Sequence, residues 1–438
     1  MTISSSLNAG VAGLSANATR LGTISDNIAN SSTMGYRRVQ TDFFSMVVEG
    51  GSGYTAGGVR ATTTRMISEG GSIVSSGNAT DIAVQGNGFI PVARVSEVNA
   101  GGAAPQMYLT STGSFTPDAQ GYLTSESGLV LMGWPADATG NVPTYPRDTA
   151  QGLEPVQLQL NQLISDPTTT IDLGVNLPAT EAQPGVTPGT PYPLSVEYYD
   201  AFGGSQSLGL SFTSQAPATP NTWNLVITDP SGNTIGDYDL TFDNTPGAGG
   251  ALIGINDNVA AAATTSPVTL TVVDPTTFPA AGPGDQTLTI NLEPAGTSSG
   301  LTQLGDTFAP LSIGRDGNEM GSMVTAEIDA NGFVTAFFDN GSTRTIYQVP
   351  LADMPNPNGM IALDRQVYQT TPESGRFMLW NAGSGPTGEI VPFAREESAT
   401  DVAGELTDMI QTQRAYSSNA KVIQTVDEML QETTNIKR

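Results

Sequence analysis

The chain has 438 residues and a formal net charge of −26, because 42 acidic side chains outnumber 16 basic ones. It contains no cysteine and no histidine, which excludes disulfides, thiol nucleophiles, serine–histidine catalysis and the usual zinc or iron ligands. So acidic a chain is a poor partner for nucleic acids, and no apolar run approaches the roughly 18 residues of a membrane span. We therefore expect no enzyme, cofactor, bound metal, nucleic-acid partner or membrane insertion. The N-terminal residues lack the basic and apolar regions of a cleaved signal peptide, so we expect none.

Residues 1–30 predict a helix. Apolar or small residues recur at alternating spacings of four and three, which is the pattern of a helix that packs along one seam. The seam residues are Leu7, Val11, Leu14, Ala18, Leu21, Ser25 and Ile28, with Ile24 beside them. Residues 1–36 carry only two charged side chains, Arg20 and Asp26. This composition favours packing against neighbours on several sides; the alternatives are an intramolecular helical hairpin and a disordered tail.

The end of this helix leads into a connector, residues 31–70, for which we expect an extended or β conformation. Asn27 and Asn30 can hydrogen-bond backbone groups where the helix ends. Gly35 can supply a backbone conformation that larger residues resist. Tyr36 offers an aromatic face and a hydroxyl that needs a partner.

Short alternating runs broken by Gly, Asn and Asp predict a discontinuous β domain formed by residues 71–150 and 318–398. The segments 118–122 (DAQGY) and 329–333 (DANGF) share one pattern, and each predicts a hairpin turn. Gly86-Asn-Gly88 lacks the third glycine and the following helix of a phosphate-binding loop, so we interpret it as a β-turn.

Residues 151–317 predict a separate, acidic and outermost β domain, either a sandwich or a barrel. Strand-like runs such as 223–228 (WNLVIT) and 287–292 (TLTINL) alternate with turns rich in Pro and Gly. From Thr149 to Gly314 there are 15 acidic residues and no Lys or Arg. Asp237, Asp239 and Asp243 lack the ligand spacing of a calcium loop, so we interpret them as a solvated face.

Residues 399–438 predict a second helix with the same heptad spacing. Its seam residues are Val402, Leu406, Met409, Gln413, Tyr416, Ala420, Ile423, Asp427 and Leu430, with Ile410 and Val426 widening the stripe. We expect the two terminal helices to form a helical assembly domain, 1–30 with 399–438. The expected fold class is α+β and mainly β: a coiled-coil-like layer of terminal helices and two antiparallel β domains nested between them.

Four ordered motifs resemble the bacterial flagellar axial proteins, the rod and hook family. They are residues 24–37 (ISDNIANSSTMGYR), 82–89 (IAVQGNGF), 109–115 (LTSTGSF) with 121–123 (GYL) and 133–134 (GW), and 405–416 (ELTDMIQTQRAY). Within the acidic stretch, residues 176–178 (NLP) and 198–203 (YYDAFG) are typical of hook rather than rod members. Ser31, Ser32 and Met34 depart from the commoner residues of the first motif, and Ala399 and Thr400 from those before the last helix.

The resemblance implies a structural subunit of the flagellar hook. Such subunits leave the cell through the flagellar export apparatus and self-assemble outside it into a curved tube. That tube couples the torque of the motor from the rod to the filament. The implied partners are other copies of the chain, the distal rod, the hook cap, the hook–filament junction proteins and the export apparatus. The alternatives are a distal-rod or hook-associated junction protein and, from another class, a secreted β-domain adhesin or carbohydrate-binding protein.

We expect the assembly interface to be formed by both chain ends. The residues that we assign to it are Leu7, Val11, Leu14, Leu21, Ile24, Asn27, Ile28, Asn30, Gly35, Tyr36, Val402, Leu406, Met409, Ile410, Gln413, Arg414, Tyr416, Ile423 and Leu430.

Overall fold

The computed structural model describes residues 3–46, 57–100, 105–137, 139–159, 163–187, 189–245, 250–272, 286–292 and 300–436. The chain divides into two compact units. The first comprises Met1–Leu160, Thr325–Ala336 and Thr343–Arg438, and the second comprises Asn161–Val324 and Phe337–Ser342. Strands make up 44% of the structure and helices 18%, so the fold is mainly β with a helix at each end of the chain, as expected. None of the described helices is long and apolar enough to cross a membrane.

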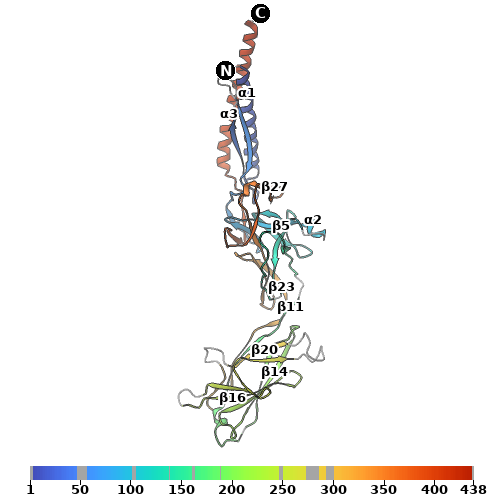
Figure 1. Ribbon diagram of the computed structural model, residues 1–438, viewed down its shortest axis with the longest axis vertical. Helices are drawn as coiled ribbons and strands as arrows, with labels where there is room; N and C mark the ends of the chain where they lie inside the picture. The colour runs from blue at the N-terminus through green and yellow to red at the C-terminus, as the bar shows by residue number, and fades with distance from the viewer. Residues whose placement is uncertain are drawn as a thin grey trace. The chain divides into compact units, whose positions relative to one another are not determined.

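The helical part of the first unit is formed by both chain ends and a hairpin. Helix α1 (Ile3–Ala29) lies beside helix α3 (Val402–Ile436), and the antiparallel strands β1 (Val39–Ser45) and β2 (Val59–Arg65) run along α1 (Figure 1). Both helices span nearly the ranges that their heptad spacing predicts. The connector is therefore a β-hairpin whose register pairs Val39 with Arg65.

The β part of the first unit is built from short antiparallel strands. β5 lies between β6 and β9, and β4 lies between β7 and β30. The elements are β3 (Ile73–Ser75), β4 (Asp81–Gln85), β5 (Ile90–Arg94), α2 (Val95–Asn99), β6 (Tyr108–Thr110), β7 (Thr112–Pro117), β8 (Leu123–Ser125), β9 (Leu129–Pro135), β10 (Glu154–Pro155), β25 (Thr343–Gln348), β26 (Pro350–Asp353), η2 (Pro357–Gly359), β27 (Ile361–Leu363), β28 (Val367–Gln369), β29 (Met378–Asn381), β30 (Glu389–Pro392) and β31 (Ala394–Glu396). Their buried core includes Phe89, Leu109, Trp134 and Tyr368.

The two predicted hairpin turns are confirmed. Segment 118–122 joins β7 to β8, where the Asp118 carboxylate accepts the backbone N–H groups of Gln120 and Tyr122, each at 2.9 Å. Segment 329–333 joins β23 (Asn318–Ile328) to β24 (Phe333–Phe338), two strands that have residues in both units. Gly121 and Gly332 have φ of 86° and 83°, a conformation that glycine adopts without steric cost.

The second unit encloses one hydrophobic core, which includes Leu173, Phe212, Trp223 and Leu288. Strands β13 to β18 form a six-stranded antiparallel sheet in sequence order, and β12, β19, β20, β21 and β22 form a second sheet. The strands are β11 (Leu163–Asp166), β12 (Thr170–Leu177), β13 (Tyr192–Tyr199), β14 (Ser205–Ser214), β15 (Thr222–Thr228), β16 (Thr234–Phe242), β17 (Leu252–Asp257), β18 (Ala262–Thr264), β19 (Val268–Val272), β20 (Gln286–Asn291), β21 (Thr302–Gln303) and β22 (Ala309–Arg315), with one 3₁₀ turn, η1 (Ala179–Ala182).

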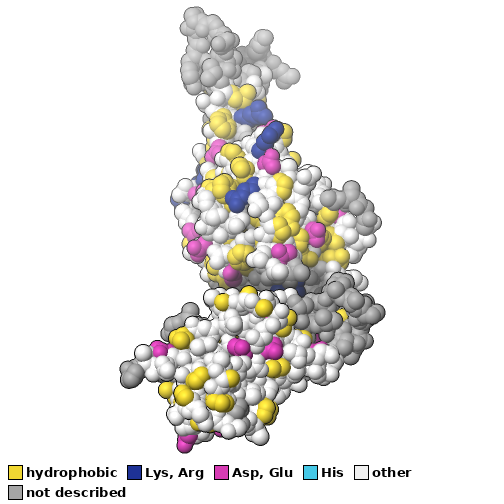
Figure 2. Space-filling model, turned by 60° about the horizontal axis from the view of Figure 1, so that its bottom comes forward, with side chains coloured by type: hydrophobic (Ala, Val, Ile, Leu, Met, Phe, Trp, Pro, Cys, Tyr) yellow, Lys and Arg dark blue, Asp and Glu magenta, His cyan; other side chains and the backbone are white. Residues whose placement is uncertain are grey.

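Two features of the second unit differ from the sequence interpretation. β12 runs parallel to β20 and β21 and antiparallel to β22, so its sheet is mixed rather than purely antiparallel. The expected acidic domain began at residue 151, but β10 pairs with β9 and residues up to 160 lie in the first unit. Figure 2 shows acidic side chains on the surface of the second unit. By sequence, that unit contains 17 acidic residues and one basic residue, Arg315.

Candidate assembly interface

The contact between α1 and α3 is made where α1 carries glycine. Gly10 and Gly13 are buried, and a Cβ atom added to them would lie 3.2 Å from Cγ1 of Ile423 and 2.8 Å from Nδ2 of Asn419. Glycine therefore allows the two backbones to approach closely. Gly22 differs, because no atom of the described residues lies within 4 Å of its added Cβ.

The predicted seam of α1 is displaced by one residue, which corrects the expected helix register. Along α1 the described buried positions are Ser5, Gly10, Gly13, Ala16, Asn17, Ile24 and Asn27. Five of them, Gly10, Gly13, Asn17, Ile24 and Asn27, directly precede a residue of the predicted seam. The larger side chains of that seam therefore lie at the edge of the α1–α3 contact, because the close approach at the glycines decides which face of α1 meets α3.

The seam of α3 is displaced at three of its nine positions. Among the α3 residues whose burial is described, Glu405, Thr412 and Val426 are buried. Each lies one position before a residue of the predicted stripe, namely Leu406, Gln413 and Asp427. Met409, Tyr416 and Ile423 keep their place and are half-buried. The interhelical contact is therefore more polar than the heptad pattern indicates.

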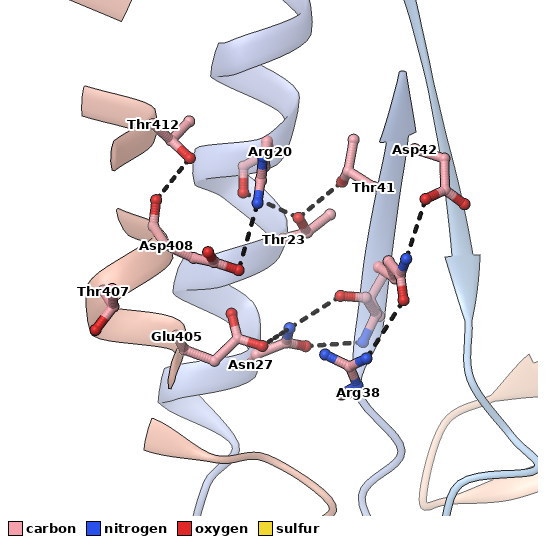
Figure 3. A network of polar contacts seen from close by, with 12 residues as sticks. Arg20, Thr23, Asn27, Arg38, Thr41, Asp42, Glu405, Thr407, Asp408 and Thr412 are labelled. Carbon is pink, nitrogen blue, oxygen red and sulfur yellow. Dashed lines mark hydrogen bonds and ion pairs between the residues drawn. The ribbon is translucent and has the colours of Figure 1, made fainter. Parts of the chain in front are cut away.

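Asn27 joins α1, α3 and β1 at the base of the helices (Figure 3). Its Nδ2 donates to the backbone carbonyl of Val39 and to Oε1 of Glu405, both at 2.9 Å, and its Oδ1 accepts the backbone N–H of Val39 at 2.8 Å. The amide thus pairs with both backbone groups of Val39, as a neighbouring strand would. Asn27 is 1% exposed, so its removal would leave buried groups unpaired.

Further polar contacts surround this junction. Arg20 on α1 lies 3.3 Å from Asp408 on α3, and the Thr23 and Thr41 hydroxyls are 2.8 Å apart between α1 and β1 (Figure 3). The Tyr36 hydroxyl lies 2.9 Å from Oδ2 of Asp26. Burial, with the hydrogen bond to Asp26, raises the pKa of Tyr36 to about 12. These contacts fix the entry of the chain into β1.

A buried ion pair connects this junction to the β part. Nη2 of Arg37 lies 3.0 Å from Oε2 of Glu396, and the two side chains are only 7% and 3% exposed. Oε1 of Glu396 accepts the backbone N–H of Gly71 at 2.7 Å. Its backbone carbonyl accepts the N–H of Gly35, whose φ of 71° favours glycine.

Glu405 gives the helix pair a dependence on pH. Burial raises the pKa of this carboxyl, and the nearby charge of Asp408 raises it further. The hydrogen bond from Asn27 and the positive charges of Arg38 and Arg20 lower the pKa, but the net shift is upward. The folded state therefore binds the proton more tightly than the unfolded chain, so the helix pair loses stability as the pH rises above the ordinary pKa of a glutamate.

We expect Glu405→Gln to raise the melting temperature of the helical circular dichroism signal at pH 7. The same variant should flatten the decline of this melting temperature between pH 4.5 and 7. Glu428→Gln, an exposed change on the same helix, is the control and should leave the slope unchanged.

Large apolar side chains remain exposed on the helical part. Val402, Leu406 and Ile410 follow one flank of α3 at 38%, 47% and 52% exposure, and Val422 and Met429 lie on another. On the α1 side, Val11, Phe43, Phe44 and Met46 are 41–57% exposed. We call these nine residues the apolar helical face. Exposed large apolar side chains in this number mark contacts with other macromolecules.

The predicted interface residues fall into three groups. Ile24, Asn27, Gly35 and Tyr36 are buried within the chain. Leu7, Leu14, Leu21, Ile28, Asn30, Met409, Tyr416 and Ile423 are half-buried. Val11, Val402, Leu406, Ile410, Gln413, Arg414 and Leu430 are exposed.

Sequence reasoning missed Phe43, Phe44 and Met46. The sequence contained a signal for them, because consecutive apolar residues on a strand point to opposite faces of the hairpin. A hairpin that lies on one helix has only one of its two faces covered by that helix.

Models of flagellar proteins match three parts of the chain. The flagella basal body rod protein family matches residues 7–37, and the C-terminal family of the flagellar basal body rod FlgEFG proteins matches residues 394–436. The flagellar basal body protein FlaE D2 domain matches residues 170–318, within the second unit. The chain ends thus match flagellar axial proteins.

Relatives match over the whole chain. Flagellar hook protein FlgE of Rhizobium meliloti is 34% identical over 447 residues, covering 100% of both chains. That of Escherichia coli is 28% identical and covers 98% of both. The crystal structure of Helicobacter pylori flagellar hook protein FlgE2 aligns at 16% identity with a TM-score of 0.43, covering 74% of this chain and 99% of that one. The chain belongs to the flagellar hook protein family, and it is a structural component of the flagellum, outside the cell.

Proposed function

We propose that this subunit polymerises through its helical part into a curved tube that transmits torque from the rod to the filament. The observation that carries the proposal is the apolar helical face. α3 presents apolar side chains on two flanks beside the side that contacts α1, which is more than one partner helix can cover. Contacts with several copies of the chain would bury them, and the hydrophobic effect would then drive assembly.

The order of the two units along the chain also supports assembly through the helical part. Both chain ends form the helical part, and the second unit is an excursion from the middle of the sequence. We propose that the helical part forms the inner layer and that the acidic second unit lies outermost. By resemblance, the further partners are the distal rod, the hook cap, the hook–filament junction proteins and the export apparatus.

A charge on the apolar helical face tests the assembly proposal. Leu406→Asp is expected to raise the concentration needed for polymerisation at least tenfold. A buried leucine contributes about 1.5–3 kcal/mol and each ~1.4 kcal/mol corresponds to a factor of ten. Sedimentation of the purified chain measures the effect. The control Thr407→Asp adds the same charge to the next, exposed residue and should change assembly less. Equal polymerisation of Leu406→Asp and the wild type would refute this interface.

Immunogold electron microscopy tests the place of the protein in the flagellum. An antibody raised against residues 151–317 should label a short curved segment between the cell surface and the filament. Label confined to a straight rod after the envelope is dissolved would instead assign the chain to the distal rod.

A further inference from the structure

A cavity of about 310 Å³ in the first unit is formed by segments that lie far apart in the sequence. Residues of the segments 110–115, 125–129 and 365–366 line it, together with Met34 and Arg395. Most of these side chains carry a hydroxyl or a guanidinium group, so the cavity suits a polar ligand. Assembly through the apolar helical face gives this cavity no role.

Arg365 reaches the cavity from a turn whose backbone favours glycine. The turn, residues 364–366, joins β27 to β28. Arg365 and Gln366 have φ of 72° and 55°, a left-handed conformation that residues other than glycine rarely adopt. Such outliers cluster at sites that bind or react. Nη1 of Arg365 donates to the backbone carbonyl of Ser127, so the turn holds this guanidinium beside the cavity.

Arg395 supplies a second guanidinium group. Its Nε is buried and has no hydrogen-bond partner. Among the residues that the structure describes, neither Arg395 nor Arg365 forms an ion pair, although the chain has a net charge of −26. A buried donor without an acceptor is costly, and more so when the donor is charged. A bound anion would supply the missing acceptor.

A pair of serine hydroxyls adds another donor on the lining of the cavity. The Oγ atoms of Ser125 and Ser127 are 2.8 Å apart, and Oγ of Ser125 also accepts the backbone N–H of Leu129 at 3.1 Å. The bond between the two hydroxyls uses one of their O–H groups. The other O–H group remains to donate to a ligand.

The charges around the cavity match an anion with a single negative charge. Its charged lining residues are Arg365, Arg395 and the exposed Glu126, so their sum is 2 − 1 = +1. One carboxylate neutralises this charge, whereas a doubly charged phosphate group would leave an excess. Guanidinium groups also match the planar geometry of a carboxylate with their fork of N–H donors.

We propose that this cavity binds a carboxylate group, which accepts hydrogen bonds from Arg365, Arg395 and the Ser125–Ser127 hydroxyl pair. The carboxylate comes either from an acidic side chain of a neighbouring copy or from a free carboxylic acid. The inference does not depend on the proposed function, because a single subunit contains the whole cavity.

Saturation-transfer difference NMR with acetate tests the site on the purified monomer at constant ionic strength. The wild-type chain should transfer saturation to the acetate methyl group. Arg395→Gln should raise the Kd of acetate about tenfold, because it removes a charge-assisted hydrogen bond. The control Arg376→Gln changes an exposed arginine outside the cavity and should leave the Kd unchanged. No transfer from the wild-type chain, or equal Kd values for the two variants, overturns the proposal.

The variant Arg365→Gly separates a ligand-binding residue from one that only supports the turn. Glycine suits the left-handed backbone, so the urea midpoint of the monomer should stay the same or rise, while the Kd of acetate should rise about tenfold. A lower midpoint with an unchanged Kd would show that Arg365 only supports the turn, and would overturn the proposal.

The same NMR measurement on the assembled polymer distinguishes the two sources of the carboxylate. Loss of the acetate signal on polymerisation assigns the cavity to an acidic side chain of a neighbouring copy. A signal that persists assigns it to a free carboxylic acid. Wild-type chains that fail to polymerise would refute the proposed function, while acetate binding by the monomer would still support the site.

Discussion

Replacing Arg37 with leucine is expected to lower the free energy of unfolding of the first unit by about 3–5 kcal/mol, because it leaves the Glu396 carboxylate buried without its cation. Glu396 is 2% exposed. Its carboxylate also accepts the backbone N–H of Gly71, and its backbone carbonyl accepts the N–H of Gly35. The loss would therefore loosen the connection between the helical part and the β part. Urea denaturation of the full chain measures it, with peptide-resolved hydrogen exchange to place the loss in the first unit.

The next residue provides the matched control for Arg37→Leu. Arg38 pairs with Glu69 at the same distance of 3.0 Å, but the two side chains are 35% and 46% exposed. Exposed ion pairs contribute about 0–1 kcal/mol, so Arg38→Leu should cost no more than that. The double variant Arg37→Leu/Glu396→Leu leaves no unpaired charge and should cost less than Arg37→Leu alone. Equal losses for Arg37→Leu and Arg38→Leu would contradict the burial argument.

Filling the glycine contact between the helices is expected to separate α1 from α3. Leucine at Gly10 and Gly13 together would overlap Ile423 and Asn419. Overpacking costs about 1–3 kcal/mol at each site. Leucine is a far better helix former than glycine, by about 0.8–1 kcal/mol in a helix interior. Because the substitution by itself favours the helix, any loss of helix stability comes from the lost contact with α3. The melting of the helical circular dichroism signal measures it.

Gly22 is the control for this pair. No described residue lies within 4 Å of a Cβ atom added to Gly22, so Gly22→Leu should stabilise α1 in the monomer. If α1 packs against a second copy at this exposed position, the same variant should weaken polymerisation. A Gly10→Leu/Gly13→Leu chain that melts like Gly22→Leu would contradict the close α1–α3 approach.

The helices and many turns follow from local pattern. Heptad spacing predicts both terminal helices because a helix repeats every 3.6 residues whatever it packs against. The turns at 118–122 and 329–333 are predictable because the Asp carboxylate binds backbone N–H groups a few residues ahead, and glycine supplies the positive φ. These interactions join residues only a few positions apart, so the local sequence is enough to predict the turns.

The register of the helix pair does not follow from the pattern. An apolar stripe shows that a helix packs, but not whether the partner is its own chain or another copy. In this subunit the glycines contact α3, and part of the stripe remains exposed on the apolar helical face. Likewise, the parallel pairing of β12 with β20 joins residues more than 100 positions apart, which no short-range signal records.

From the sequence, local composition and spacing indicated the terminal helices, the mainly β middle and the acidic character of the insert, whereas the class of protein came from the resemblance of four motifs to a known family. The tertiary structure alone decided which face of each helix is buried and that Asn27 and the Arg37–Glu396 pair tie the helices to the β part. It alone brought Arg365 and Arg395 to one cavity. Those features depend on distances between segments far apart in the chain, which no local pattern records.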